Sequence, residues 1–186
     1  MIIDLIKEGG KNVLDAGCGC GILFYGLKKR FSNLNGIDLR DDIKDIKKAL
    51  EKDGVKANLI NGNLFNLPYK NNIFDCIVSM SVLEHISDLD RPIKEIARVL
   101  KENGHAIIGF PVKNFIMHQF FKIIKFDDEK DHPSHHRDIY NALKRNFNVE
   151  KIVIFPSFLK IDHALYVVCS CKKNKIKIDH ESHKLK

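Results

Sequence analysis

Three glycines on alternate positions, Gly17, Gly19 and Gly21, constrain this chain more than any other feature of its sequence. The preceding residues 13–16 are mostly apolar and suit a buried strand, and residues 22–30 have a helical pattern. Glycine permits positive φ and lets a ligand approach the backbone without meeting a Cβ atom. A strand that passes through such a turn into a helix predicts a site for a nucleotide-like ligand.

The neighbours of these glycines argue against two common phosphate-binding patterns. A dinucleotide fingerprint needs a third glycine where this chain has Ile22 or Phe24. No Lys-Ser or Lys-Thr pair follows, so a loop for a nucleoside triphosphate is not expected. Asp15, at the end of the strand, would oppose a pyrophosphate. It would suit a ligand that carries a cationic amino group and a sulfonium centre.

Residues 13–21 resemble the first motif of class I S-adenosylmethionine-dependent methyltransferases, in their small-molecule, type 11-like branch. Later family motifs are matched in the same order, and the resemblance covers about residues 11–111. The matching segments are residues 36–39, 62–69, 72–79, 82–86 and 98–104. The resemblance implies an α/β, Rossmann-like methyltransferase fold with a seven-stranded, mostly parallel sheet. An antiparallel last strand and helices on both faces are expected.

The same resemblance implies that S-adenosyl-L-methionine is the cofactor. Asp38 stands where an acid accepts hydrogen bonds from the ribose hydroxyls, although it could instead cap the next helix. Asn63 stands where the family usually has Asp; its side-chain oxygen can accept from the adenine amino group, or it can form an Asx turn. The expected cofactor-binding residues are Asp15, Gly17, Gly19, Gly21, Asp38, Leu39, Asn63, Leu64, Ser79 and Met80.

Apolar patterning predicts the remaining elements. Strands are expected at residues 12–16, 33–37, 57–60, 73–80 and 105–110, and a closing antiparallel pair at 149–155 and 164–171. Helices are expected at residues 22–30, 41–52, 90–100 and 140–147, with another starting at residue 83. Residues 1–171 are therefore predicted to form one domain, and the lysine-rich residues 172–186 a basic, mobile tail.

The acceptor side of the site is less defined. Residues 112–137 are expected to be a substrate insertion, in which residues 115–126 form an aromatic lid or, alternatively, core or dimer surface. The candidates for a catalytic base are His85, His135 and His136. Arg137 could hold a carboxylate or phosphate of the acceptor, whereas Glu84 is expected to pack or cap its helix. No spacing fits a defined metal site, so no metal is expected.

Composition limits the partners and the location. Five cysteines, an odd number, suit reduced thiols, and the pairs Cys18/Cys20 and Cys169/Cys171 are interpreted as packing residues. No apolar run could span a membrane and no signal peptide is visible, so a cytoplasmic protein is expected. Part of the net charge of +7 lies in the tail, and nucleic acid is not expected as a partner.

The expected function is transfer of a methyl group to a small-molecule acceptor by in-line displacement. One alternative is a cofactor-binding regulatory or scaffold subunit of the same fold. Another is an RNA methyltransferase, although residues 79–82 lack the Asn/Asp-Pro-Pro-Tyr motif of amino-group methylation. A nicotinamide dehydrogenase is disfavoured by Ile22 and Phe24. The acceptor itself cannot be named from the sequence.

Overall fold

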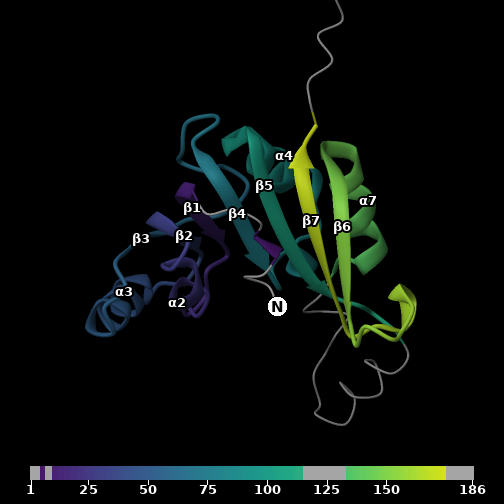
Figure 1. The fold of residues 1–186 in the computed structure, drawn as a ribbon, viewed down its shortest axis with the longest axis horizontal. Helices are drawn as coiled ribbons and strands as arrows, with labels where there is room; N and C mark the ends of the chain where they lie inside the picture. The colour runs from purple at the N-terminus through teal and green to yellow at the C-terminus, as the bar shows by residue number, and fades with distance from the viewer. Residues whose placement is uncertain (1–4, 7–9, 115–132, 175–186) are drawn as a thin grey trace, which may run out of the picture.

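A computed structural model describes residues 5–6, 10–114 and 133–174 of the chain. Seven strands form one sheet in the order β3-β2-β1-β4-β5-β7-β6 (Figure 1). The strands are β1 (Gly10–Ala16), β2 (Phe31–Asp38), β3 (Ala57–Asn61), β4 (Phe74–Met80), β5 (Leu100–Pro111), β6 (Phe147–Phe155) and β7 (Tyr166–Lys173). The helices are α2 (Phe24–Leu27), α3 (Ile43–Lys52), α4 (Asp90–Val99) and α7 (His136–Asn146), with short 3₁₀ turns η1 (Leu83–His85) and η2 (Ile161–His163).

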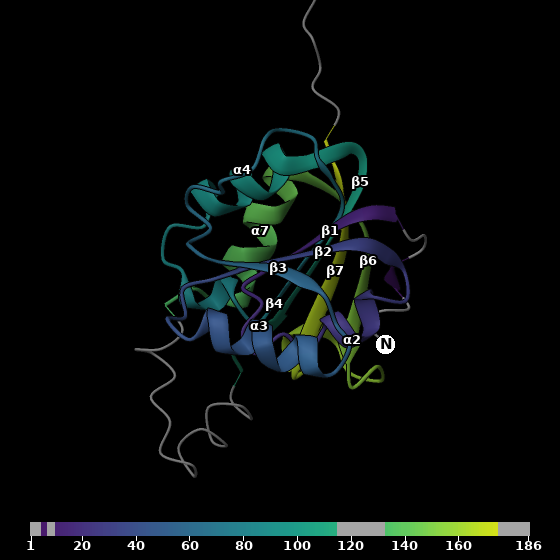
Figure 2. The same cartoon turned by 90° about the vertical axis from the view of Figure 1, so that its left-hand side faces the viewer.

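The sheet has the predicted direction pattern. The pairings from β3 through β5 are all parallel, whereas β7 is antiparallel to both of its neighbours, β5 and β6. Figure 2 shows α2 and α3 on one side of the sheet and α4 and α7 on the other. The expected α/β fold, with a mostly parallel seven-stranded sheet and helices on both faces, is therefore confirmed.

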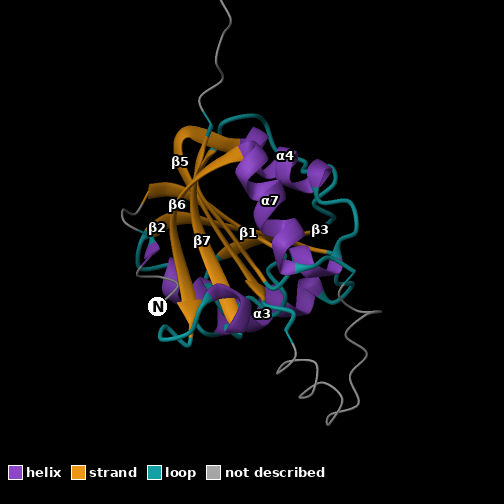
Figure 3. Ribbon diagram, turned by 90° about the vertical axis from the view of Figure 1, so that its right-hand side faces the viewer, coloured by secondary structure: helices purple, strands orange, loops and turns teal. Residues whose placement is uncertain are grey.

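Burial on both faces explains the apolar run of the central strands. Val13 and Leu14 of β1 and Ile77 and Val78 of β4 have no solvent exposure. Parallel strands covered by helices on both sides read as continuous apolar segments rather than alternating ones. One core cluster packs α4 and α7 on the sheet and the other packs α2 and α3 on its opposite face. Figure 3 shows α4 and α7 together along their face.

A carboxylate at the edge of the core fixes the start of β1 against β4. Asp75 accepts hydrogen bonds from the backbone N–H groups of Lys11 (3.0 Å) and Asn12 (2.8 Å) and from Lys101 Nζ (2.5 Å). Burial alone would raise the pKa of Asp75, but the hydrogen bonds from Lys101 and Asn12 outweigh it and lower this pKa. The central strand that leads into the glycine turn is thereby held at its other end.

Several predicted boundaries are wrong. The helix predicted at residues 22–30 is only the single turn α2, because i→i+3 hydrogen bonds from Lys29 and Arg30 tighten its end and turn the chain into β2. Residues 83–85 form a 3₁₀ turn instead of the start of a longer helix. β5 begins at Leu100, and its pairing with β4 shifts register between Phe74 and Cys76. β7 continues past its predicted end at residue 171 to Lys173.

The predicted lid at residues 115–126 and the tail from residue 175 onward lie outside the described residues. Within the described ranges, no helix has the length and hydrophobicity that a membrane crossing requires.

Candidate functional site

A cleft of about 940 Å³ lies where the parallel strands β1 to β4 end. Because β7 runs in the opposite direction, its first residue, Tyr166, reaches the same edge of the sheet and also lines the cleft. Open α/β sheets bind ligands at the carboxyl ends of their strands. The other lining residues come from the turn after β1, the ends of β2 and β4, the segment after β3 and the region around η1.

The glycine turn is held against β2 and leaves its tip open. The N–H groups of Gly17 and Cys18 donate to the carbonyl of Ile37 at 2.8 and 3.1 Å. Gly17 has a φ of +86°, and a Cβ atom there would lie 2.2 Å from Val82 Cγ2. Gly19 has a φ of +49°, and a Cβ atom there would meet nothing within 4 Å. Gly17 thus serves packing, whereas Gly19 presents bare backbone to the cleft.

Gly21 has a different position from the other two glycines. It does not line the cleft, and an added Cβ atom would lie 2.8 Å from Leu50 Cδ1 of α3. Its small size therefore lets α3 pack against the turn.

Asp38 is directed toward the glycine turn. Its Oδ2 accepts from the N–H of Gly19 at 2.7 Å, and its Oδ1 accepts from the N–H of Arg40 at 3.2 Å. The alternative role as a helix cap does not apply, because the N-cap of α3 is Asp42, which pairs with Arg40 at 2.6 Å. Asp38 lines the cleft together with Asp15.

Asp15 is a buried acid at the cleft. It is 2 % exposed. This burial raises the pKa of Asp15 well above its ordinary value, and the nearby charge of Asp38 adds a smaller contribution in the same direction. Two carboxyl groups in one cleft favour a cationic ligand over a pyrophosphate.

The other side of the cleft combines a polar turn with apolar surfaces. Asn63 lines the cleft, and its Oδ1 accepts from the N–H of Phe65 at 3.0 Å, which is the Asx turn considered above. An amide oxygen has a second lone pair, so this bond does not prevent acceptance from a ligand. Leu39, which is 69 % exposed, and Leu64 also line this part of the cleft.

The two residues predicted to bind the cofactor at the end of β4, Ser79 and Met80, differ in their position relative to the cleft. Met80 lines the cleft. Ser79 is 1 % exposed, does not line the cleft, and donates from Oγ to the carbonyl of Ala16 at 2.8 Å. Ser79 therefore ties β4 to β1 beneath the site.

Of the three histidines predicted as a base, only His85 lines the cleft within the described residues. His135 caps α7 by accepting from the N–H of Arg137 at 3.3 Å. His136 is 4 % exposed, with Nδ1 accepting from the N–H of Lys113 and Nε2 lying 3.4 Å from Asp162 Oδ1. Burial lowers the pKa of His136, as does the adjacent His135.

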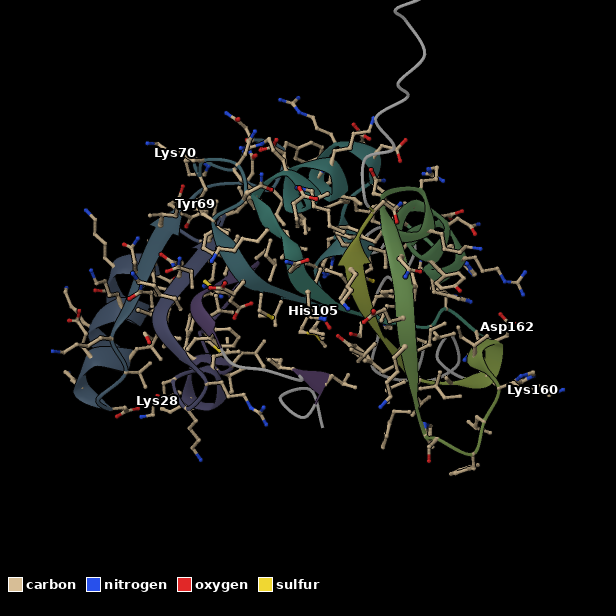
Figure 4. The ribbon with its side chains drawn as sticks, turned by 45° about the horizontal axis from the view of Figure 1, so that its top comes forward. Lys28, Tyr69, Lys70, His105, Lys160 and Asp162 are labelled. Carbon is tan, nitrogen blue, oxygen red and sulfur yellow. The ribbon has the colours of Figure 1, made fainter. Side chains whose placement is uncertain are left out.

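Arg137 belongs to the same cluster outside the cleft. Its Nε and one terminal nitrogen contact Asp162 Oδ1 at 3.2 and 3.0 Å. Asp162 lies on the connection between β6 and β7, across the molecule from Lys28 (Figure 4). The guanidinium thus already has an acidic partner within the protein.

Three residues near the cleft were missed or undervalued by the sequence analysis. Ser81 has a φ of +56°, and its Oγ lies 2.9 Å from the hydroxyl of Tyr166; both line the cleft. Glu84 is buried as expected, but its Oε2 has no hydrogen-bond partner among the described residues, and burial raises its pKa. No local pattern in the sequence could connect Tyr166 to this site.

The cysteines follow the packing interpretation with one exception. Cys18, Cys169 and Cys171 are buried, whereas Cys20 is exposed and lines the cleft. The interpretation of Cys20 as a packing residue is therefore wrong, because the glycine turn directs its side chain outward. No group of three His, Cys, Asp or Glu side chains suited to a metal is found in the described part of the chain.

Comparison with known proteins supports a single family. The family model described as a methyltransferase domain matches residues 14–108. The ubiquinone biosynthesis O-methyltransferase of Coxiella burnetii is 33% identical over 107 residues, which are 57% of this chain and 46% of the relative. The sterol 24-C-methyltransferase of Aspergillus fumigatus is 31% identical over 137 residues, 71% of this chain and 33% of the relative. The chain thus spans less than half the length of these relatives.

Solved structures share the fold at low sequence identity. Geranyl diphosphate C-methyltransferase from Streptomyces coelicolor, solved with S-adenosyl-L-homocysteine, has a TM-score of 0.75 at 16% identity, covering 93% of this chain and 75% of that one. The PH0226 protein of Pyrococcus horikoshii has a TM-score of 0.74 at 19% identity, covering 93% and 86%.

Proposed function

The chain belongs to the methyltransferase domain family, and we propose that it binds S-adenosyl-L-methionine in the cleft and transfers the methyl group to a small-molecule acceptor. The observation that carries the proposal is that Asp15 and Asp38 line the same cleft as an open glycine turn. This arrangement matches a ligand that has both a ribose and cationic groups.

The residues present fit this cofactor. The open backbone at Gly19 admits a ligand, and Asp38 retains lone pairs for the ribose hydroxyls beside its bond to that glycine. Asn63 offers its amide to the adenine edge, and Leu39 and Leu64 offer apolar surface to the ring faces. Asp15 would stand near the cationic methionine part.

The sulfonium supplies an activated methyl group when the cofactor is bound. The protein's own task is to hold the acceptor in line and to exclude water from the reacting atoms. Ile22, Val82 and Ile86 give the cleft apolar walls for this purpose. His85 is the proposed base where the acceptor must lose a proton, because it lines the cleft whereas His135 and His136 do not.

Calorimetric titration with S-adenosyl-L-methionine, and with NADH and ATP for comparison, tests the binding step. We expect saturable binding of S-adenosyl-L-methionine alone; binding of NADH instead would contradict the assignment. Transfer of a tritiated methyl group to the organic-extractable fraction of a metabolite extract tests the reaction. Binding without transfer to any extract would favour the regulatory or scaffold subunit.

The location and the assembly state belong to the same proposal. Five free cysteines are consistent with a reducing, cytoplasmic environment. A homodimer is tested by sedimentation equilibrium, and contact with nucleic acid by tRNA filter binding over a salt series.

A further inference from the structure

We propose that Tyr166 and Ser81 bind the polar head of the methyl acceptor, and that this acceptor is an uncharged molecule with a hydroxyl group on an apolar body. The inference rests on the proposed function, because it assigns the acceptor end of the same cleft. It adds two residues and a substrate class that the sequence analysis did not contain.

The order of the sheet gives the position of this pair. Asp38 ends β2, the glycine turn follows β1, Ser81 follows β4, and Tyr166 begins β7. In the sheet, β7 lies two strands beyond β4 (Figure 1). Adjacent strands are spaced by about 4.8 Å, so β7 lies about 19 Å from β2 along the sheet. The ribose and adenine groups are assigned to the β2 and β3 side, which leaves the β4 to β7 side for the acceptor.

The two hydroxyls are held in place by the backbone. Ser81 has a φ of +56°, and its N–H donates to the carbonyl of Gly109 at 2.9 Å. A Cβ atom on Gly109 would lie 2.1 Å from Met80 Cε and 2.9 Å from Tyr166 Cε1, so the glycine makes room for both side chains. A non-glycine residue in the left-handed region is uncommon, and such residues cluster at functional sites.

The pair can both donate and accept a hydrogen bond. Ser81 Oγ and Tyr166 Oη lie 2.9 Å apart, so one hydroxyl donates to the other and the second O–H remains available to a ligand. Burial raises the pKa of Tyr166 to about 12, and the nearby Glu84 contributes to this shift. The phenol therefore stays protonated at neutral pH and offers an uncharged contact.

The surrounding charges disfavour an anionic acceptor. Among the described residues that line the cleft there is no lysine or arginine, whereas Asp15, Asp38 and Asp88 are present. Arg137, the sequence candidate for an anion contact, is paired with Asp162 outside this lining. A carboxylate or phosphate head would thus lose its hydration without gaining a lysine or arginine partner from this lining, while a hydroxyl head needs only the neutral pair.

The inference is tested by measuring the Kd values of three small probes. The protein is first saturated with S-adenosyl-L-homocysteine. The probes are 4-butylphenol, butylbenzene, which lacks the hydroxyl, and 4-butylbenzoate, which is an anion. We expect the phenol to bind about three- to tenfold more tightly than the hydrocarbon, as one neutral hydrogen bond allows. The benzoate should bind most weakly. A wild-type protein that does not distinguish phenol from hydrocarbon overturns the inference.

The variants Tyr166→Phe and Ser81→Gly should each remove the preference for the phenol. Ser81→Gly keeps a residue that adopts positive φ, and the double variant should lose no more than either single variant if the hydroxyls act together. The matched control is Tyr140→Phe on α7, outside the cleft lining, which should retain the preference. Tyr166→Phe with an unchanged preference refutes the assignment.

Titration with S-adenosyl-L-homocysteine distinguishes a failure of the proposed function from a failure of the acceptor site alone. All four variants should bind it as the wild type does. A wild-type protein that fails to bind it refutes the proposed function, and the acceptor site with it. Normal binding without phenol preference refutes the acceptor site alone.

Discussion

Replacing Asp38 by asparagine tests the cofactor site most directly. The carboxylate of Asp38 has about four lone-pair positions. Two of them already accept hydrogen bonds, from Gly19 at 2.7 Å and from Arg40 at 3.2 Å. The remaining two match the two hydroxyls of a ribose. The amide of the Asp38→Asn variant would keep an oxygen for the Gly19 N–H, so the glycine turn should retain its conformation while the charge is lost.

The expected effect follows from these two contacts. A hydrogen bond to a charged group contributes about 1 kcal/mol more than a neutral one. Loss of the charge at both ribose hydroxyls should therefore cost about 2 kcal/mol, which is about a 30-fold increase in the Kd for S-adenosyl-L-methionine. Asp38→Ala should weaken binding further, because it also leaves the Gly19 N–H without its acceptor.

Calorimetric titration of each variant measures these constants. Asp42→Asn is the matched control, since it removes the same charge from an exposed residue that pairs with Arg40 and does not line the cleft. Its Kd should stay within about twofold of the wild type. Equal affinities of the Asp38→Asn and Asp42→Asn variants for S-adenosyl-L-methionine would refute the proposed contact between Asp38 and the ribose hydroxyls.

Three further predictions concern the glycine turn and its surroundings. Gly17→Ala should lower the free energy of unfolding by about 2–4 kcal/mol, since it combines positive φ with a clash against Val82. The control Gly54→Ala, at φ +69° with open space around the added Cβ atom, should lower it by only about 1–2 kcal/mol. Equal losses of unfolding free energy in urea titrations of the two variants would contradict this. Asp15→Asn should stabilise the protein near pH 7, because the raised pKa of Asp15 means that ionisation opposes folding. This gain should fade as the pH falls and be lost below about 3, where the carboxyl is protonated in both the folded and the unfolded state, and a gain independent of pH in denaturation curves would rule it out. Iodoacetamide should modify Cys20 before Cys18, because Cys20 is exposed whereas burial raises the pKa of the Cys18 thiol to about 12. S-adenosyl-L-methionine should protect Cys20 from this reaction. Mass spectrometry that shows Cys18 modified first would contradict the prediction.

The fold was predictable because its central strands carry unambiguous patterns. Residues 73–80 are nearly all apolar, as a strand covered on both faces requires, and the glycine turn identifies β1. Boundaries were less predictable where tertiary contacts decide them. The α2 helix stops after one turn because the chain must enter β2, and β5 extends back to Leu100 through an irregular register with β4. Neither constraint is visible in local propensity.

The candidate site also has a part that the sequence could predict and a part that it could not. The proposed cofactor side comes from short segments after consecutive strands, so motif spacing predicted that Asp38 and Asn63 would line the same cleft as the glycine turn. The sequence could not tell that Ser79 faces β1 rather than the cleft, because a shift of one residue along a strand reverses the side-chain direction. Tyr166 depends on the insertion of β7 between β5 and β6, which no local pattern encodes.

The position of β7 also has a consequence for how such a site can diverge. The residues assigned to the cofactor are contributed before residue 81, whereas one half of the Ser81–Tyr166 pair is contributed 85 positions later. During synthesis the strands that carry the proposed cofactor residues therefore emerge well ahead of β7, which completes the proposed acceptor pair. Under the proposed function, evolutionary changes confined to that late strand would alter which acceptor is bound, while the residues proposed to bind the cofactor keep their sequence.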